Sequence, residues 1–186
     1  MPFVLKDAIT GLEAFDIEFV KLNEGEHVFN FRLDKKFFEA FDNEEILAAD
    51  IKVEALLERF PTLMNLQLQL SGTMAVSCDR CLVALDMPTT TEHTVIYKFV
   101  PEGANPVHSS GESEFVVLTH QDHTINLAQD CYETALLSLP MIRNCDDLET
   151  KPCNQEMLAK LNDLSHEEEE SSDPRWDKLK QLLKNK

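Results

Sequence analysis

The sequence is poor in glycine, with 5 among 186 residues, and it contains no Gly-rich phosphate-binding motif. A loop that cradles phosphate needs glycines, because its backbone N–H groups must approach the ligand closely. The chain also lacks any apolar run near the roughly 18 residues of a membrane-spanning helix. Residues 1–7 have no charged region followed by a long apolar region, so no signal peptide is expected. These absences predict a cytoplasmic protein that binds neither nucleotides through a phosphate loop nor membranes.

Basic residues are scarce relative to acidic ones, at 17 against 34, and the formal net charge is −17. An acidic surface repels nucleic-acid phosphates, which argues against broad electrostatic coating of RNA or DNA. Basic proteins, or a local basic patch, remain as contacts. Hydrophobic residues make up 43% of the chain, enough for a folded core.

The first two thirds of the chain show the alternation of apolar and polar residues that is typical of β-strands. The clearest strand is 66–76, where leucines, Met74 and Val76 lie on one face and polar residues on the other. A hairpin turn is predicted at 23–25, and Asp34 is expected to cap a short helix containing Phe37, Phe38 and Phe41. The predicted strands are 15–19, 29–33, 51–57, 66–76, 91–99 and 115–118.

The period changes to that of a helix after residue 126. Apolar residues between Leu127 and Leu139 follow 3.6-residue spacing, Asn126 with Gln129 suggests a capping box, and Pro140 closes the segment. A short helix is predicted around 157–161, and 101–113 has the composition of a loop. We therefore expect an α+β fold: a twisted antiparallel sheet, with barrel-like closure as one option, covered by helices.

The domain organisation follows from charge and composition. Residues 1–164 are expected to form a single domain, 165–173 an acidic linker and 174–186 a basic amphipathic helix as a C-terminal appendage.

Four of the five cysteines predict one metal site. Cys78 and Cys81 form a CxxC motif at the end of the clearest strand, and Cys145 and Cys153 follow the long helix in an irregular segment. Thiols stay reduced in the cytoplasm, and two cysteines at CxxC spacing can direct both sulfurs to one tetrahedral ion. We predict a structural zinc ion, because four thiolates leave no open position for a reacting water. The alternative is four separate thiols. Cys131 lies on the apolar face of its helix and is interpreted as a core residue.

Other residues of the sequence are weaker candidates for a site. A thioredoxin-like redox site needs its CxxC at the start of a helix, whereas this one follows a strand. Histidines could replace one cysteine as a ligand, although each is more typical of a surface. No activated-serine motif is visible. The histidines considered for this role, which flank the transition from strands to helix, are His108, His120 and His123.

The CDRCL motif at Cys78–Leu82, after a strand ending Ser71-Gly72-Thr73, resembles the YceD family of large ribosomal RNA subunit accumulation proteins. The resemblance continues through Ile125-Asn126-Leu127, the helix ending Leu137-Ser138-Leu139-Pro140-Met141, and the segment 173–180, so it covers about 66–186. It departs at the second cysteine pair, where the family commonly has a compact C-x-G-L-C cluster. The overall pattern is closest to a Bacteroidetes-type branch.

The resemblance implies a bacterial, non-enzymatic accessory factor that supports accumulation or processing of large-subunit ribosomal RNA. Implied partners are ribosomal RNA or a pre-ribosomal particle, with a basic ribosomal protein as an alternative, and no small-molecule substrate. A thiol oxidoreductase or a ribonuclease is the rival from another class. The basic C-terminal helix is either docked by its apolar side or in contact with RNA. Its candidate contact residues are Arg175, Trp176, Lys178, Lys180 and Lys184.

Overall fold

The computed structural model describes residues 11–100, 115–119, 121–145 and 153–164. Its centre is a five-stranded sheet in the order β2-β3-β4-β5-β6. Strands β2 to β5 follow one another as antiparallel neighbours, and β6 pairs with β5 in parallel. The strands are β2 (Gly25–Asp34), β3 (Ile46–Arg59), β4 (Leu63–Ser77), β5 (Ala84–Phe99) and β6 (Phe115–Leu118).

Side chains alternate between the two faces of this sheet, as the sequence predicts. On β4, Leu66, Leu68 and Leu70 are at most 1% exposed, whereas the polar residues between them face solvent. Ile51 and Val53 on β3 are buried in the same layer. One face of the sheet therefore carries the main core, and the other is wet.

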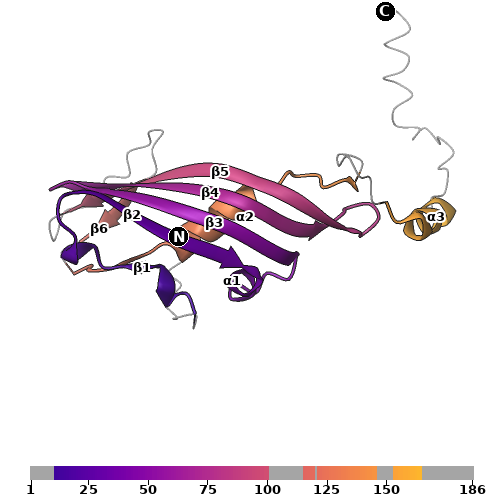
Figure 1. The fold of residues 1–186 in the computed structure, drawn as a ribbon, viewed down its shortest axis with the longest axis horizontal. Helices are drawn as coiled ribbons and strands as arrows, with labels where there is room; N and C mark the ends of the chain where they lie inside the picture. Colours follow the sequence, from indigo (N-terminus) through magenta and orange to yellow (C-terminus); the bar gives the residue numbers. More distant parts are fainter. Residues whose placement is uncertain (1–10, 101–114, 120, 146–152, 165–186) are drawn as a thin grey trace, which may run out of the picture.

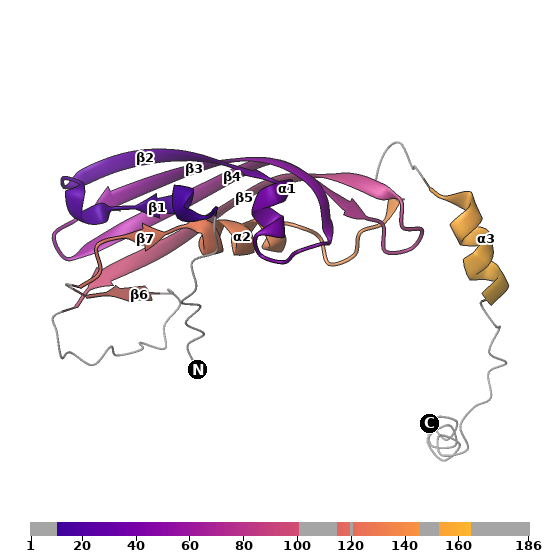
Figure 2. The same cartoon turned by 90° about the horizontal axis from the view of Figure 1, so that it is seen from below.

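Helices and a small second sheet cover the buried face (Figures 1 and 2). The second sheet pairs β1 (Asp16–Ile17) with β7 (Ile125–Asn126). The remaining covering elements are η1 (Glu13–Phe15), η2 (Phe19–Lys21), α1 (Lys35–Glu39) and α2 (Ala128–Leu137). Aromatic rings join these layers. Phe15 stacks on Phe31 with centroids 4.9 Å apart, and Phe41 stacks on Tyr132 at 4.2 Å.

The predicted cap of α1 is confirmed, and that of α2 is wrong. Asp34 Oδ1 accepts a hydrogen bond from the Phe37 backbone N–H at 3.0 Å. Asn126 Oδ1 instead accepts from the Ala128 N–H, and Gln129 donates to Glu133, so no reciprocal capping box forms. The Asn126 amide also donates to the Leu12 carbonyl at 2.9 Å, which ties the start of α2 to the N-terminal segment.

Three further expectations need correction. Residues 15–19 do not form a hairpin with 29–33, because β1 pairs with β7 and is flanked by the 3-10 turns η1 and η2. The sheet is not purely antiparallel, since β6 is parallel to β5. Among the described strands the sheet is open, with β2 and β6 at its edges, so no barrel closes.

The C-terminal part of the described chain is the predicted short helix, α3 (Gln155–Leu164), which extends beyond the end of the sheet (Figure 1). The predicted loop 101–113, linker 165–173 and helix 174–186 lie outside the described residues, and the domain boundary at 164 stays a prediction.

Candidate metal centre

Three of the four predicted ligands meet at one end of the sheet. Cys78 and Cys81 lie in the turn between β4 and β5, and Cys145 lies in the segment that follows α2. Their Sγ atoms are all within 4.8 Å of one another, and Cys81 Sγ is 3.7 Å from Cys145 Sγ. All three side chains are fully buried. The fold thus brings together cysteines that are more than sixty positions apart in the sequence.

The CxxC turn is shaped by its own backbone hydrogen bonds. The Cys78 N–H donates to the Val83 carbonyl at 2.8 Å, and the Leu82 N–H donates to the Cys78 carbonyl at 3.0 Å. Leu82 closes the turn with a φ of 60°, a left-handed conformation that costs a non-glycine residue roughly 1–2 kcal/mol. Strain of this size is held where the surroundings fix the turn, and here the fixed turn directs both sulfurs inward.

A second contact fastens the turn to the segment that carries Cys145. The Asp79 N–H donates to the Arg143 carbonyl at 2.9 Å, and the Arg143 N–H donates to Asp79 Oδ2 at 2.7 Å. The guanidinium of Arg143 lies 3.1 Å from Asp79 Oδ1 and 3.5 Å from Glu45 Oε2. The backbone hydrogen bond from Arg143, followed by its side chain, lowers the pKa of Asp79. Arg143 therefore sets the position of Cys145, two residues further along.

Cys153, the fourth predicted ligand, lies at the margin of this cluster. Its side chain is partly buried, and its sulfur is not among the three that lie within 4.8 Å of one another. Arg80 joins it to the others, since Arg80 Nη2 is 3.8 Å from the Sγ atoms of both Cys145 and Cys153. Cys153 also packs on the cluster together with Met157 and Leu158 of α3.

The surroundings act differently on two of the thiols. Backbone N–H groups of Asn154 and then Val83 donate to the Cys81 sulfur and lower its pKa from 9.0 to about 6. Burial, assisted by contacts with Cys153 and Cys81, raises the pKa of Cys145 to about 12. The two shifts run in opposite directions, toward the thiolate at Cys81 and toward the thiol at Cys145. A divalent cation would stabilise both as thiolates and displace the proton.

The geometry and chemistry of the donors fit zinc. Zn–S bonds of about 2.3 Å at tetrahedral angles place neighbouring sulfurs about 3.8 Å apart. The separation of Cys81 and Cys145 sulfurs, 3.7 Å, matches this value. A thiolate donor set suits a closed structural site, and the cation Arg80 beside it offsets part of the negative charge that several thiolates bring.

The other predicted candidates lie elsewhere. Cys131 is buried in the main core, as predicted, and burial raises its pKa to about 12. His123 is exposed and belongs to no metal-ligand cluster of the described residues, and His108 and His120 lie outside those residues. The sequence reasoning missed Arg80, although its place between Cys78 and Cys81 was a usable signal. It also missed the contact between Asp79 and Arg143, which no motif indicates.

The predicted RNA or partner contacts lie outside the part of the chain that the structure describes. These are Arg175, Trp176, Lys178, Lys180 and Lys184. Within the described part, no helix is long and apolar enough to cross a membrane.

Comparison with known proteins places the chain in a family. The family model described as "Large ribosomal RNA subunit accumulation protein YceD" matches residues 66–183. Searches among curated proteins and among solved structures gave no match. The family match covers more than half of the 186 residues and includes most of β4, all of β5, α2 and α3, and all five cysteines. The chain therefore belongs to the YceD family.

Proposed function

We propose that the protein is a non-enzymatic, cytoplasmic accessory factor that supports accumulation or processing of large-subunit ribosomal RNA. The observation that carries this proposal is the family match over residues 66–183, since the family is named for this role. Its partner is ribosomal RNA or a pre-ribosomal particle, and a small-molecule substrate is not needed.

A structural zinc ion is the proposed cofactor, with Cys78, Cys81 and Cys145 as ligands and Cys153 as the fourth. The support is a buried sulfur cluster with one S–S separation suited to tetrahedral zinc. Cys153 lies beside Arg80 and Cys145, so a small movement of its side chain would bring its sulfur to the metal. Zinc here would hold the β4–β5 turn against the segment after α2, and four thiolates would leave no position for catalysis.

The direct test is a ribosomal RNA profile. Deleting the gene should lower large-subunit RNA relative to small-subunit RNA, and the intact gene supplied in trans should restore it. An unchanged ratio in the deletion strain would refute the proposed function. A variant with Cys78→Ser and Cys81→Ser should fail to restore the ratio, whereas Cys131→Ser, which leaves the cluster intact, should restore it.

A pull-down from cell extract separates two ways of acting. Partners that remain bound after nuclease treatment favour a ribosomal protein as the direct contact. Partners lost on nuclease treatment favour RNA, with the segment 174–186 as the candidate contact. Purified protein is also expected to leave RNA intact and to reduce no dithiol-exchange substrate. A thioredoxin-like redox site would have a helix starting at its CxxC motif. Here residues 79–81 form a turn that leads into β5.

A further inference from the structure

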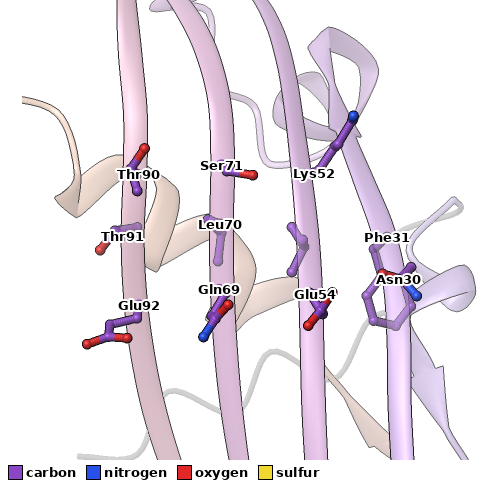
Figure 3. A pocket seen from close by; sticks show the side chains of 11 residues that line it. Asn30, Phe31, Lys52, Glu54, Gln69, Leu70, Ser71, Thr90, Thr91 and Glu92 are labelled. Carbon is purple, nitrogen blue, oxygen red and sulfur yellow. The ribbon is translucent and has the colours of Figure 1, made fainter.

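The wet face of the sheet is wide, and no described element covers it. We call it the open face: the outward side chains of β2 to β5, opposite α1 and α2. Pairing registers arrange it in rows across four strands, one of them Asn30, Glu54, Gln69 and Glu92, and the next Arg32, Lys52, Ser71 and Thr90. All eight side chains are exposed. Members of both rows line a hollow of about 710 Å³ on the four strands (Figure 3).

The charges of the open face are unbalanced. Arg32 is already paired with Asp50 at 2.8 Å, and Lys98 Nζ lies 3.5 Å from the centre of the Phe115 ring at the β6 edge. Among the outward lysines and arginines of β2 to β5, Lys52 is then the one with neither an ion pair nor an aromatic contact within the described residues. The same face carries five carboxylates that make no ion pair within the described residues: Glu26, Glu54, Glu58, Asp86 and Glu92. The field over the hollow is therefore negative and attracts cations.

The chemistry of the face also excludes single-stranded RNA as its occupant. Sheets that bind RNA stack bases on outward aromatic rings and hold phosphates with cations. On β2 and β5 the aromatic residues, Phe29, Phe31, Tyr97 and Phe99, alternate onto the core side. β3 and β4 contain no aromatic residue. Phe31 also lines the hollow, but its ring already stacks on Phe15 on the core side. A polyanion would therefore meet unpaired carboxylates and no free aromatic ring projecting outward from β2 to β5.

We propose that the open face binds an extended, arginine- or lysine-rich protein segment, with Glu54 and Glu92 as its principal contacts. This inference deepens the proposed function and rests on it, because it names the chemistry of the partner. Glu54 and Glu92 share a row and are separated by β4, so their attachment points are about 10 Å apart, two strand spacings. An extended chain advances about 3.3 Å per residue, so cations three positions apart span this distance. Gln69, between the two carboxylates, offers an amide to the backbone of the segment.

The test uses the full chain and a short labelled peptide in which every third residue is arginine and the others are serine. Fluorescence anisotropy should show binding that weakens as salt rises. Glu54→Lys with Glu92→Lys should weaken it at least about tenfold, the loss expected when charge pairs at a contact are reversed. The matched control is Glu13→Lys with Glu44→Lys, which changes net charge equally at exposed sites off the face and should change affinity by less than about twofold.

Several results would overturn the proposal. Equal weakening by both double variants would mean that net charge alone attracts the peptide, and equal binding of a peptide with citrulline in place of arginine would remove the charge argument. Binding of single-stranded RNA that Glu54→Lys with Glu92→Lys abolishes would assign the face to RNA. If the protein forms a dimer without the peptide and that variant is monomeric, the open face binds a second copy of this chain instead. Circular dichroism checks folding, and Glu54→Gln with Glu92→Gln replaces the lysine variant should it unfold.

The same variants in cells separate this inference from the proposed function. If gene deletion lowers large-subunit RNA but the Glu54→Lys, Glu92→Lys variant restores it fully, the open face plays no part and the proposed function stands. If deletion has no effect on RNA while the peptide binds at the face, the proposed function fails and the binding surface remains.

Discussion

Replacing Cys145 by serine should remove the metal from the protein. The cluster has three buried sulfurs within 4.8 Å, and serine keeps the size of the side chain but offers a hydroxyl that is a poor zinc ligand at neutral pH. Purified wild-type protein should contain close to one zinc per chain, and Cys145→Ser close to none. Cys131→Ser is the matched control, because Cys131 is equally buried but lies in the main core.

The size of the effect on stability distinguishes metal loss from simple damage to packing. A metal present at about 1,000 times its dissociation constant stabilises the folded chain by about 4.1 kcal/mol. For a chain of this length, each kcal/mol corresponds to about 2–4 °C in melting temperature. A strong chelator should therefore lower the melting temperature of the wild-type protein by roughly 8–16 °C. Burying the new hydroxyl in Cys131→Ser costs about 1–3 kcal/mol, but the response to the chelator should persist.

The deciding quantity is the chelator-dependent part of the melting temperature, measured by scanning calorimetry alongside elemental analysis. It should be large in the wild-type protein and in Cys131→Ser, and absent in Cys145→Ser. A wild-type protein that is fully folded, free of metal and indifferent to the chelator would refute the zinc assignment. So would a chelator effect of equal size in Cys145→Ser, because the metal would then be bound elsewhere.

Three further outcomes are expected. Gly72→Ala should destabilise the protein by about 1–3 kcal/mol or more in urea unfolding, because an added Cβ would lie 2.1 Å from the Asp50 carbonyl oxygen and force β3 and β4 apart. Asp34→Ala should cost about 1 kcal/mol and Asp34→Ser much less, since serine can still cap α1. Burial raises the pKa of Cys131 from 9.0 to about 12, so its contribution to stability is full below pH 9 and is lost as the pH rises through 12. The free energy of unfolding should therefore fall less steeply between pH 9 and 11 in Cys131→Ser than in the wild-type protein.

The sequence predicted the sheet well where local alternation decides the structure. The pattern of β4 has period two over its whole length, and only a strand with one buried face satisfies it. Phe15, Ile17 and Phe19 carry the same pattern over too short a span. There, two 3-10 turns bury both phenylalanines equally well, and the short strand between them pairs with β7. That pairing joins residues about 110 positions apart, and local periodicity holds no information about it.

The candidate metal centre was likewise predictable only where its geometry is local in the sequence. CxxC spacing alone indicates that Cys78 and Cys81 can bind the same metal ion, because the turn geometry is local. The approach of Cys145 depends on the long-range contact between Asp79 and Arg143, which no motif records. Cys145 and Cys153 were assigned to the site because they lie together in the irregular segment after the long helix, and the structure leaves Cys153 at its margin beside Arg80.

The position of the cluster explains why this end of the molecule would need a metal. The described residues form two hydrophobic clusters, and the main one lies under the sheet, where α1, α2 and the N-terminal turns cover it. The second is small: Cys78, Cys81, Leu85 and Cys145 are its only buried members among the described residues, with side chains of α3 packed on it. Such a cluster buries too little apolar surface to order the β4–β5 turn and α3 unaided. Zinc would supply the missing stabilisation locally, so its loss should release α3 and the segment after α2 while the main core and the open face remain folded.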